Sequence, residues 1–146
     1  MRKAVSILVL VAAVSLLMVS SCKSTPKQVT DETFRAMYQL WYSGLILEGA
    51  QKYTVKSGDR MVDISRSFYG DPYFYPVIML ASRDVVVDPY KIEPGMELVV
   101  PDLQRNLNSV TAKASIKGVI NDCARIEDQR GYPDTAAGLR EHAGRI

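Results

Sequence analysis

The sequence predicts an α+β fold, in which a small strand–helix–helix–strand unit is flanked by an N-terminal helix and a C-terminal helical hairpin. Three observations predict it. Between residues 52 and 101, two short alternating segments enclose two helical stretches. An amphipathic stripe precedes this unit at residues 31–50. A longer stripe follows it and is interrupted once, at Gly131-Tyr132-Pro133-Asp134, before a last helical segment.

The composition is that of an ordinary globular chain, and its charge is close to balanced. The 146 residues are 47% hydrophobic and 23% charged, with a formal net charge of +2. When Arg2 and Lys3 are set aside with the N-terminal segment, 16 basic residues remain against 16 acidic ones. This balance gives no indication of nucleic-acid binding or of an electrostatic membrane patch.

The N-terminus has the features of an export signal. Met1-Arg2-Lys3 is basic, and the uncharged apolar run from Ala4 to Val19 is short for a membrane-spanning helix. The run ends in Val19-Ser20-Ser21-Cys22, which resembles the lipobox of bacterial lipoproteins, although alanine and glycine are commoner than the two serines. The resemblance implies that Cys22 is lipidated and that residues 1–21 are removed. An uncleaved membrane anchor is the alternative.

Between this signal and the central unit we expect a tether and one helix. Residues 23–30 are polar and contain Pro26, which is typical of a linker. Thr30 or Asp31 can cap a helix that ends near Gly49. Apolar residues recur along it at steps of three and four: Phe34, Met37, Tyr38, Trp41 and Leu45. This stripe predicts a core-facing helix, and a membrane-surface helix is the alternative.

The central unit is predicted in four steps. Residues 52–56 alternate as a strand, and Ser57-Gly58-Asp59 forms a turn before a helix that carries Met61, Ile64 and Phe68 on one face. Gly70 suits the left-handed end of that helix. A second helix runs over residues 73–82, and a loop follows at 83–96. Leu98 and Val100 then alternate in a strand that Pro101 ends. The two strands can pair antiparallel, with both helices on one face.

This unit resembles the LysM domain over residues 52–102. The residues that carry the resemblance keep the order and approximate spacing of the family: Tyr53-Thr54-Val55, Gly58-Asp59, Ile64, Phe68-Tyr69-Gly70-Asp71-Pro72, Ile78, Arg83-Asp84-Val85, Asp88-Pro89, Ile92, Pro94-Gly95, Leu98 and Pro101. The sequence departs from the pattern in three places. Arg60-Met61 stands where Thr-Leu is usual, Ser82 replaces a common asparagine, and Val87 replaces a frequent glycine.

The resemblance implies binding of the N-acetylglucosamine units of peptidoglycan or chitin. It places the sugar groove between two walls, one made by Ser57, Gly58, Asp59, Arg60 and Met61, the other by Leu80, Ala81, Ser82 and Arg83. A glycine-containing turn lets backbone approach a ligand closely, and a groove with a few placed polar groups is the usual design. Arg60 and Arg83 could also pair with muramyl or stem-peptide carboxylates.

Structural interpretations of the same residues stay open. Asp59 can be a turn residue and helix cap, and Arg83 can pair on the surface with Asp84 or Asp88. The aromatic residues Tyr73, Phe74 and Tyr75 are interpreted as core and helix surface rather than as a stacking platform.

After the central unit we expect a polar link at residues 102–108 and a helical hairpin within 106–146. The first helix runs from about Asn108 to Gln129 on a broad apolar stripe, with Gly118 weakening its middle by up to about 1 kcal/mol. Cys123 is interpreted as a small buried residue of this helix. Asp134 or Thr135 can cap the second helix. The pair is predicted to pack on the helix that contains Phe34.

The sequence gives no indication of catalysis, a cofactor or a metal. His142 is the only histidine and is interpreted as a solvated helix residue. A site formed by Cys123 and His142 lacks the rigid shell that a nucleophile and its base require. One histidine and one available cysteine cannot close a zinc site.

Two functions are therefore expected, the first preferred. The chain is a non-catalytic envelope lipoprotein that is lipid-anchored to a membrane and binds peptidoglycan through N-acetylglucosamine oligomers. Lys23, rather than aspartate, after Cys22 favours the periplasmic side of the outer membrane if the cell has two membranes. In the alternative, the LysM fold has lost its sugar and serves as a structural or docking piece that engages envelope proteins. The helix of Trp41 and the hairpin would then be the working surfaces.

Overall fold

The computed structural model describes residues 28–146, which form one mixed helix-and-strand structure. The expected signal peptide and Cys22 lie outside the described residues. Within them are six α-helices and one two-stranded antiparallel sheet. No helix among these residues is both long and apolar enough to cross a membrane.

The N-terminal helix faces the core, as predicted, but it is shorter than residues 31–50. Helix α2 (Asp31–Trp41) buries Phe34, Met37 and Tyr38, and a short 3-10 turn, η1 (Tyr42–Gly44), follows it. Thr30 is the N-cap, and its amide donates to the Thr33 side chain. The helix cannot run on to Gly49, because the chain turns at Gly44 against helix α6. A Cβ on Gly44 would lie 1.9 Å from the Ser115 Oγ.

The central unit has the predicted strand–helix–helix–strand order. Strand β1 (Gln51–Thr54) pairs antiparallel with β2 (Glu97–Val100), in a register that sets Tyr53 opposite Leu98. Helix α3 (Met61–Tyr69) ends at Gly70, whose φ of 74° is the predicted left-handed conformation. The second predicted helix is divided into a 3-10 turn, η2 (Pro72–Phe74), and helix α4 (Tyr75–Ala81).

All seven residues of α4 are buried, so this helix is covered on every side. Strand β2 and helix α3 cover part of it, and helix α6 (Val110–Arg130) covers another part. Ser82, directly after α4, ties the helix to the sheet: its Oγ accepts a hydrogen bond of 2.8 Å from the amide of Val99. The central unit is therefore completed by a helix that lies outside it in the sequence.

The polar link predicted at residues 102–108 is helical in the structure. Asp102 accepts a hydrogen bond from the amide of Arg105 and begins α5 (Leu103–Asn108). Buried Asn106 ties this segment to the rest of the protein. Its side chain accepts a hydrogen bond from the amide of Ile46 and donates to the carbonyl of Ile46, both at 2.9 Å. The contact joins α5 to the segment that follows η1.

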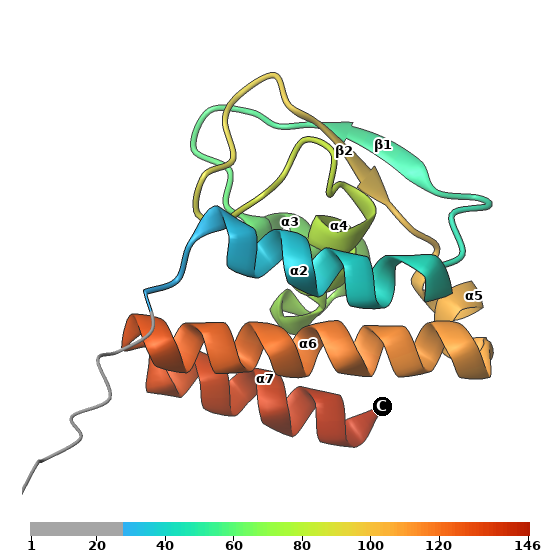
Figure 1. Cartoon of the computed structure of the whole chain (residues 1–146). Helices are drawn as coiled ribbons and strands as arrows, with labels where there is room; N and C mark the ends of the chain where they lie inside the picture. The colour runs from blue at the N-terminus through green and yellow to red at the C-terminus, as the bar shows by residue number, and fades with distance from the viewer. Residues whose placement is uncertain (1–27) are drawn as a thin grey trace, which may run out of the picture.

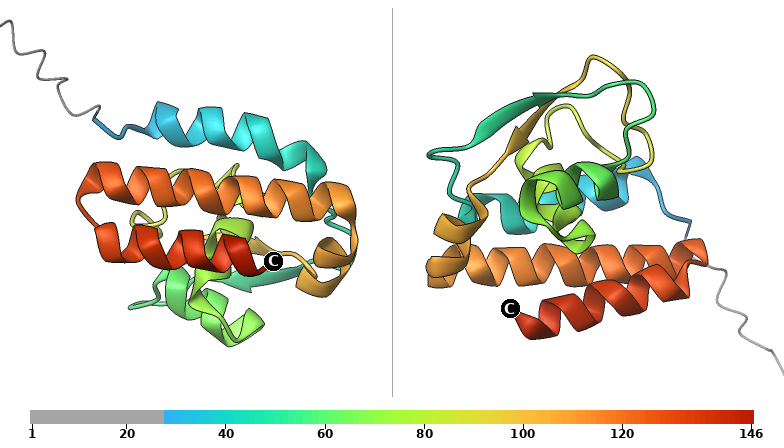
Figure 2. Two further views of the ribbon diagram at one scale, coloured as in Figure 1. Left: turned by 90° about the horizontal axis from the view of Figure 1, so that it is seen from below. Right: turned by 180° about the vertical axis from the view of Figure 1, so that it is seen from behind.

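The C-terminal hairpin is antiparallel, as predicted. Helix α6 lies between α2 and α7 (Pro133–Arg145) (Figures 1 and 2), and both α6 and α7 pack against the central unit, α6 on α4 and α7 on η2. Gly131, with φ 83°, turns the chain between the two helices. Neither Asp134 nor Thr135 caps α7. The N-cap is Tyr132, because Pro133 takes the first helical position, where its missing amide costs nothing.

Gly118 has a packing role that the sequence analysis did not predict. The Trp41 ring lies against it, and a Cβ there would be 2.5 Å from the Trp41 Cζ2. The indole Nε1 donates to Asp122 at 2.8 Å, one turn further along α6. A glycine that weakens an isolated helix thus lets α2 and α6 approach each other.

His142 is buried, and its interpretation as a solvated residue was wrong. Only 4% of it is exposed, and its Nδ1 lies 3.2 Å from the Asp71 Oδ2. Its ring makes an edge contact with Phe74 at 4.3 Å. The cause is helical spacing: His142 follows buried Leu139 by three residues, so both face η2 and α6. Burial lowers the pKa of His142, and the nearby Asp71 carboxylate partly offsets this shift.

Candidate functional site

A cleft of about 330 Å³ opens between the start of α3 and the loop that follows α4. One wall comes from Asp59, Arg60, Met61 and Val62, and Tyr75 contributes from α4. The other wall comes from Pro89, Tyr90 and Ile92, and Thr135 of α7 closes one side. Residues from four separate stretches of the chain therefore meet at this cleft.

The turn before α3 is held by Asp59. Its Oδ2 accepts hydrogen bonds from the Tyr53 hydroxyl at 2.7 Å and from the amide of Lys56 at 2.8 Å. These bonds, the one from the Lys56 backbone above all, lower the pKa of Asp59. Asp59 is thus the expected turn residue but not the helix cap, because Arg60 occupies the N-cap position of α3. The carboxylate is ionised at neutral pH and positioned at the edge of the cleft.

Arg60 and Met61 form the polar and apolar parts of the same wall. The Arg60 side chain is 72% exposed, and its Nε donates to the Asp63 Oδ2 at 2.6 Å. Met61 is 2% exposed and belongs to the core, so only its edge reaches the cleft. The wall therefore offers an exposed guanidinium beside a small apolar surface.

The facing wall is fixed to α6 through a buried charged cluster. Asp88 accepts hydrogen bonds from the amide of Tyr90 at 3.0 Å and from Arg130 at 2.5 Å. The Tyr90 hydroxyl donates to Glu127 at 2.9 Å, and Glu127 is 1% exposed. Burial raises the pKa of Glu127, while the Tyr90 hydroxyl and the Arg130 charge act in the opposite direction. The loop at 88–91 is consequently a rigid wall.

Of the nine residues predicted to form a sugar groove, the structure brings three to this cleft: Asp59, Arg60 and Met61. Ser57 and Gly58 are exposed in the preceding turn, outside the lining. Leu80, Ala81 and Ser82 are buried, at 0%, 6% and 2% exposure. These three side chains face the core because α4 is covered on all sides, so they present no side-chain surface to a ligand.

Arg83 lies elsewhere and has a partner that the sequence analysis did not consider. Its guanidinium sits 3.4 Å above the centre of the Tyr42 ring, and its Nε is 3.9 Å from the Asp84 Oδ1. The predicted pairing with Asp88 does not occur, because Asp88 is occupied by Arg130. A cation over an aromatic face stabilises by about 0.5–2 kcal/mol, depending on solvation. Arg83 therefore holds η1 against the end of α4.

Six lining residues were not predicted as groove residues: Val62, Tyr75, Pro89, Tyr90, Ile92 and Thr135. Pro89 and Ile92 stand in the segment that carries the family resemblance, so Tyr90 between them could have been found from its position. Thr135 has no such local signal, because only the folded hairpin brings it to the cleft.

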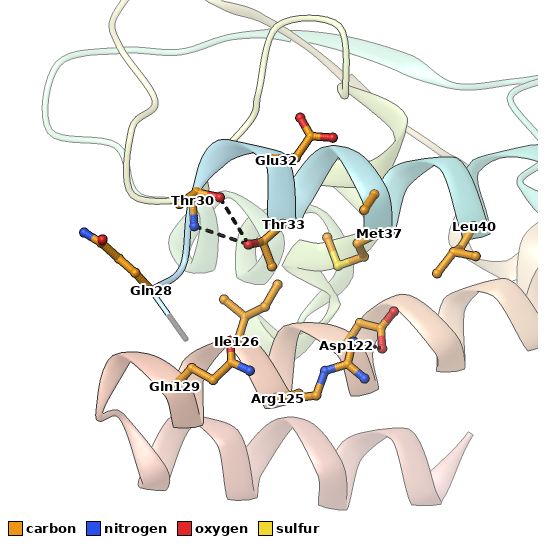
Figure 3. Close-up of a pocket in the computed structure, with 11 residues that line it drawn as sticks. Gln28, Thr30, Glu32, Thr33, Met37, Leu40, Asp122, Arg125, Ile126 and Gln129 are labelled. Carbon is orange, nitrogen blue, oxygen red and sulfur yellow. Dashed lines mark hydrogen bonds and ion pairs between the residues drawn. The ribbon is translucent and has the colours of Figure 1, made fainter. Parts of the chain in front are cut away.

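A second, larger groove of about 440 Å³ runs between α2 and α6 (Figure 3). Its floor contains Met37 and Ile126, and polar side chains such as Glu32 and Arg125 lie along its rims. Leu40 at one end is 66% exposed. The groove is therefore formed by α2 and by α6 of the hairpin, the two regions expected to bind envelope proteins if the chain serves as a docking piece.

Residues 28–146 contain no group of three or more histidine, cysteine, aspartate or glutamate side chains that could hold a metal. Cys123 is a free, buried thiol, as predicted, and burial raises its pKa strongly. Its Sγ lies 3.8 Å from the Met37 Sδ, inside the core.

One comparison with known proteins gives a match. The chain is similar to the potassium binding protein Kbp of Escherichia coli, with 42% identity over 53 residues. The matched region covers 36% of this chain and 36% of the relative, so the chain spans about a third of the relative's length. No family model and no solved structure matches the chain. The similarity is thus confined to a segment the length of the central unit.

Proposed function

We propose that this protein is a non-catalytic envelope lipoprotein whose LysM-type central unit binds N-acetylglucosamine-containing glycan, with peptidoglycan as the natural ligand. In this proposal the lipid on Cys22 anchors the chain to a membrane, on the periplasmic side of the outer membrane in a cell with two membranes. The folded residues then reach the wall from that anchor. No cofactor takes part.

The observation that carries the proposal is the cleft between the start of α3 and residues 89–92. It lies between the two loops where the resemblance to LysM domains places the sugar. It has the composition that an N-acetylated sugar requires: an apolar edge from Met61 and Ile92 for the methyl group, and charged side chains from Asp59 and Arg60 for hydroxyl groups. The strand order and the left-handed Gly70 also agree with the resemblance.

The binding site in this proposal differs from the groove expected from the sequence in one wall. Residues 89–92 replace Leu80, Ala81 and Ser82, whose side chains are buried. A tethered protein needs only a weak sugar site, because the anchor raises the effective concentration of the wall around it.

The full-length chain in mild detergent, pelleted with purified sacculi, tests this function. We expect co-sedimentation that Arg60→Glu together with Ile92→Asp reduces at least about fivefold, which corresponds to roughly 1 kcal/mol. Val110→Asp is the matched control, because Val110 is 87% exposed and begins the opposite end of α6. Failure of the wild-type chain to sediment in low and high salt alike contradicts the proposal.

The similarity to the potassium binding protein Kbp suggests a control for the same experiment. That protein is a potassium binding protein, and this chain covers 36% of it. Sedimentation measured in potassium chloride and in sodium chloride of equal ionic strength separates an ion-specific effect from screening. Glycan binding through the cleft predicts the same result in both salts.

Protein docking is the second candidate, and the groove between α2 and α6 favours it. In this alternative an envelope protein lays an apolar side chain against Leu40 and Met37 (Figure 3). Leu40→Glu would then abolish the crosslink from a photoreactive residue at Ala36 to that partner, and sacculus binding would be absent. Retained sacculus binding in Leu40→Glu favours the first function.

A further inference from the structure

Two exposed tyrosines lie side by side next to the cleft. Tyr90 is 61% exposed and Tyr132 is 51% exposed, and their ring centres are 6.0 Å apart with 33° between the ring planes. Single exposed apolar side chains need no explanation, but adjacent large ones mark a contact surface. Tyr90 is also one of the residues that line the cleft. The pair therefore extends the surface of the cleft towards the hairpin.

The Tyr90 ring is fixed although its face is open. Its hydroxyl donates to buried Glu127 at 2.9 Å, and its amide donates to Asp88 at 3.0 Å. The Arg130 guanidinium lies 5.1 Å from the centre of the same ring. Because these partners are buried or half-buried, the ring keeps one orientation without a ligand. A surface that is already ordered loses little side-chain entropy when a ligand binds.

The backbone of Tyr132 is fixed by the turn between α6 and α7. Its amide donates to the carbonyl of Glu127 at 2.9 Å, and Pro133 follows as the first residue of α7. Thr135, one turn further on, lines the cleft together with Asp59 and Met61. The hairpin thus brings two residues to the binding surface of the central unit.

Two neighbouring exposed aromatic rings suit the apolar face of a pyranose. In a β-linked N-acetylglucosamine the axial C–H bonds at C1, C3 and C5 point to the same face of the sugar ring, and this face packs on the electron-rich face of an aromatic side chain. Tyrosine supplies a large apolar area with few rotatable bonds and a hydroxyl that stays in contact with water. A sugar bound in the cleft would place the sugar linked to it over the neighbouring exposed rings of Tyr90 and Tyr132.

We propose that Tyr90 and Tyr132 form a stacking platform for a second sugar ring, so that the C-terminal hairpin takes part in glycan binding. This inference rests on the proposed function of the cleft. It assigns a role to Tyr132 and Thr135, which lie outside the region of the LysM resemblance. It also predicts that affinity rises with oligomer length up to the span of cleft and platform together.

Calorimetric titration of the full-length chain in mild detergent with the mono-, di- and trisaccharide of N-acetylglucosamine tests the platform. We expect Tyr132→Ala to raise the Kd for the trisaccharide about tenfold, and to leave binding of the monosaccharide within a factor of two. Tyr132→Phe keeps the ring and should bind as the wild type does. Val110→Ala, at the opposite end of α6, is the control for an exposed apolar residue that lies away from the cleft.

The outcomes separate this inference from the function on which it rests. If the wild type binds the trisaccharide and Tyr132→Ala binds it equally well, the platform is wrong and the cleft stands. If the wild type binds none of the three saccharides at millimolar concentration, the proposed function fails and the platform fails with it. A thermal melt of Tyr132→Ala that matches the wild type ensures that lost affinity reports on the removed ring rather than on unfolding.

Discussion

The central unit, residues 51–101, and the helices that surround it obtain their stability in different ways. The central unit is built from short elements, with strands of four residues and with turns fixed by Gly58, Gly70 and Gly95 at positive φ. The surrounding helices depend on close contacts between distant segments, such as Trp41 on Gly118 and His142 on Phe74. Local signals therefore specify the first region, and long-range packing specifies the second.

The two regions share one core, which makes the comparison testable. Val77, Ile78, Met79 and Leu80 of α4 are all completely buried, and α6 supplies Ile116, Val119 and Ile120 to the same cluster. A unit of this size exposes much of its surface when it stands alone, and it is marginally stable at best. The central unit thus has its own pattern of turns but not its own complete core.

Deletion of residues 103–146 should have the largest effect. It removes α6 from the face of α4 and exposes apolar side chains that are now buried. We expect the truncated chain to show no cooperative thermal transition in far-ultraviolet circular dichroism, whereas the full chain unfolds cooperatively. An unchanged melting temperature would mean that the central unit folds independently.

Gly118→Ala should have an intermediate effect on the free energy of unfolding. We expect it to destabilise the protein, although helix propensity alone predicts stabilisation. Propensity alone favours alanine by up to about 1 kcal/mol. A Cβ at this position would lie 2.5 Å from the Trp41 ring, and overpacking of this kind costs about 1–3 kcal/mol. We expect urea denaturation, followed by the fluorescence of Trp41, to show a net loss of about 1–2 kcal/mol.

Gly144→Ala is the matched control for this substitution. It also places alanine in a helix, but a Cβ there meets no atom within 4 Å. Its stability should equal that of the wild type or exceed it by a few tenths of a kcal/mol. If Gly118→Ala were as stable as Gly144→Ala, α2 and α6 would not pack as closely as described.

Protonation of His142 should have the smallest effect, which appears as a dependence of the free energy of unfolding on pH. Its pKa in the folded protein is lowered from the ordinary value of 6.5 by burial, so the unfolded chain binds a proton more readily. The free energy of unfolding from this group is therefore fully present above pH 6.5 and is lost as the pH falls towards the folded pKa. The slope from one such group cannot exceed about 1.4 kcal/mol per pH unit.

Urea denaturation at pH 7.5 and pH 5.5, compared between the wild type and His142→Gln, isolates this contribution. The raised pKa of buried Glu127 has the opposite influence, since it favours the folded state as the pH falls, but it is common to both proteins. We expect the wild type to lose more stability on acidification than the variant does. Equal losses would show that His142 is accessible to protons in the folded state.

Much of the central unit could be predicted because its signals are local. Alternation in residues 52–56 and the glycine after Tyr69 each specify one conformation without reference to distant residues. The helix stripes likewise identified Phe34 and Cys123 as buried. The spacing of apolar residues predicts which face of a helix is buried, but it does not predict which other element covers that face.

The features that the sequence did not predict all depend on which distant segment packs against a given helix face. His142 was assigned to solvent because its helix is polar and near the C-terminus, although its spacing from Leu139 places both on one face. The groove wall at Leu80, Ala81 and Ser82 was predicted without knowing that α6, together with β2 and α3, covers α4 on every side. Thr135 reaches the cleft, and Tyr132 lies beside Tyr90 next to it, only because the hairpin folds back on the central unit.

An amide-shift titration of the full-length chain in detergent with N-acetylglucosamine oligomers is the decisive test of glycan binding at the cleft. Binding there predicts shifts at residues 59–62, at 90–92 and at Thr135, with Tyr132 joining them for the longer oligomers. It predicts no comparable shift at Arg83, which packs on Tyr42. Absence of shifts at millimolar oligomer, or shifts confined to α2 and the groove at Leu40, would contradict glycan binding at the cleft.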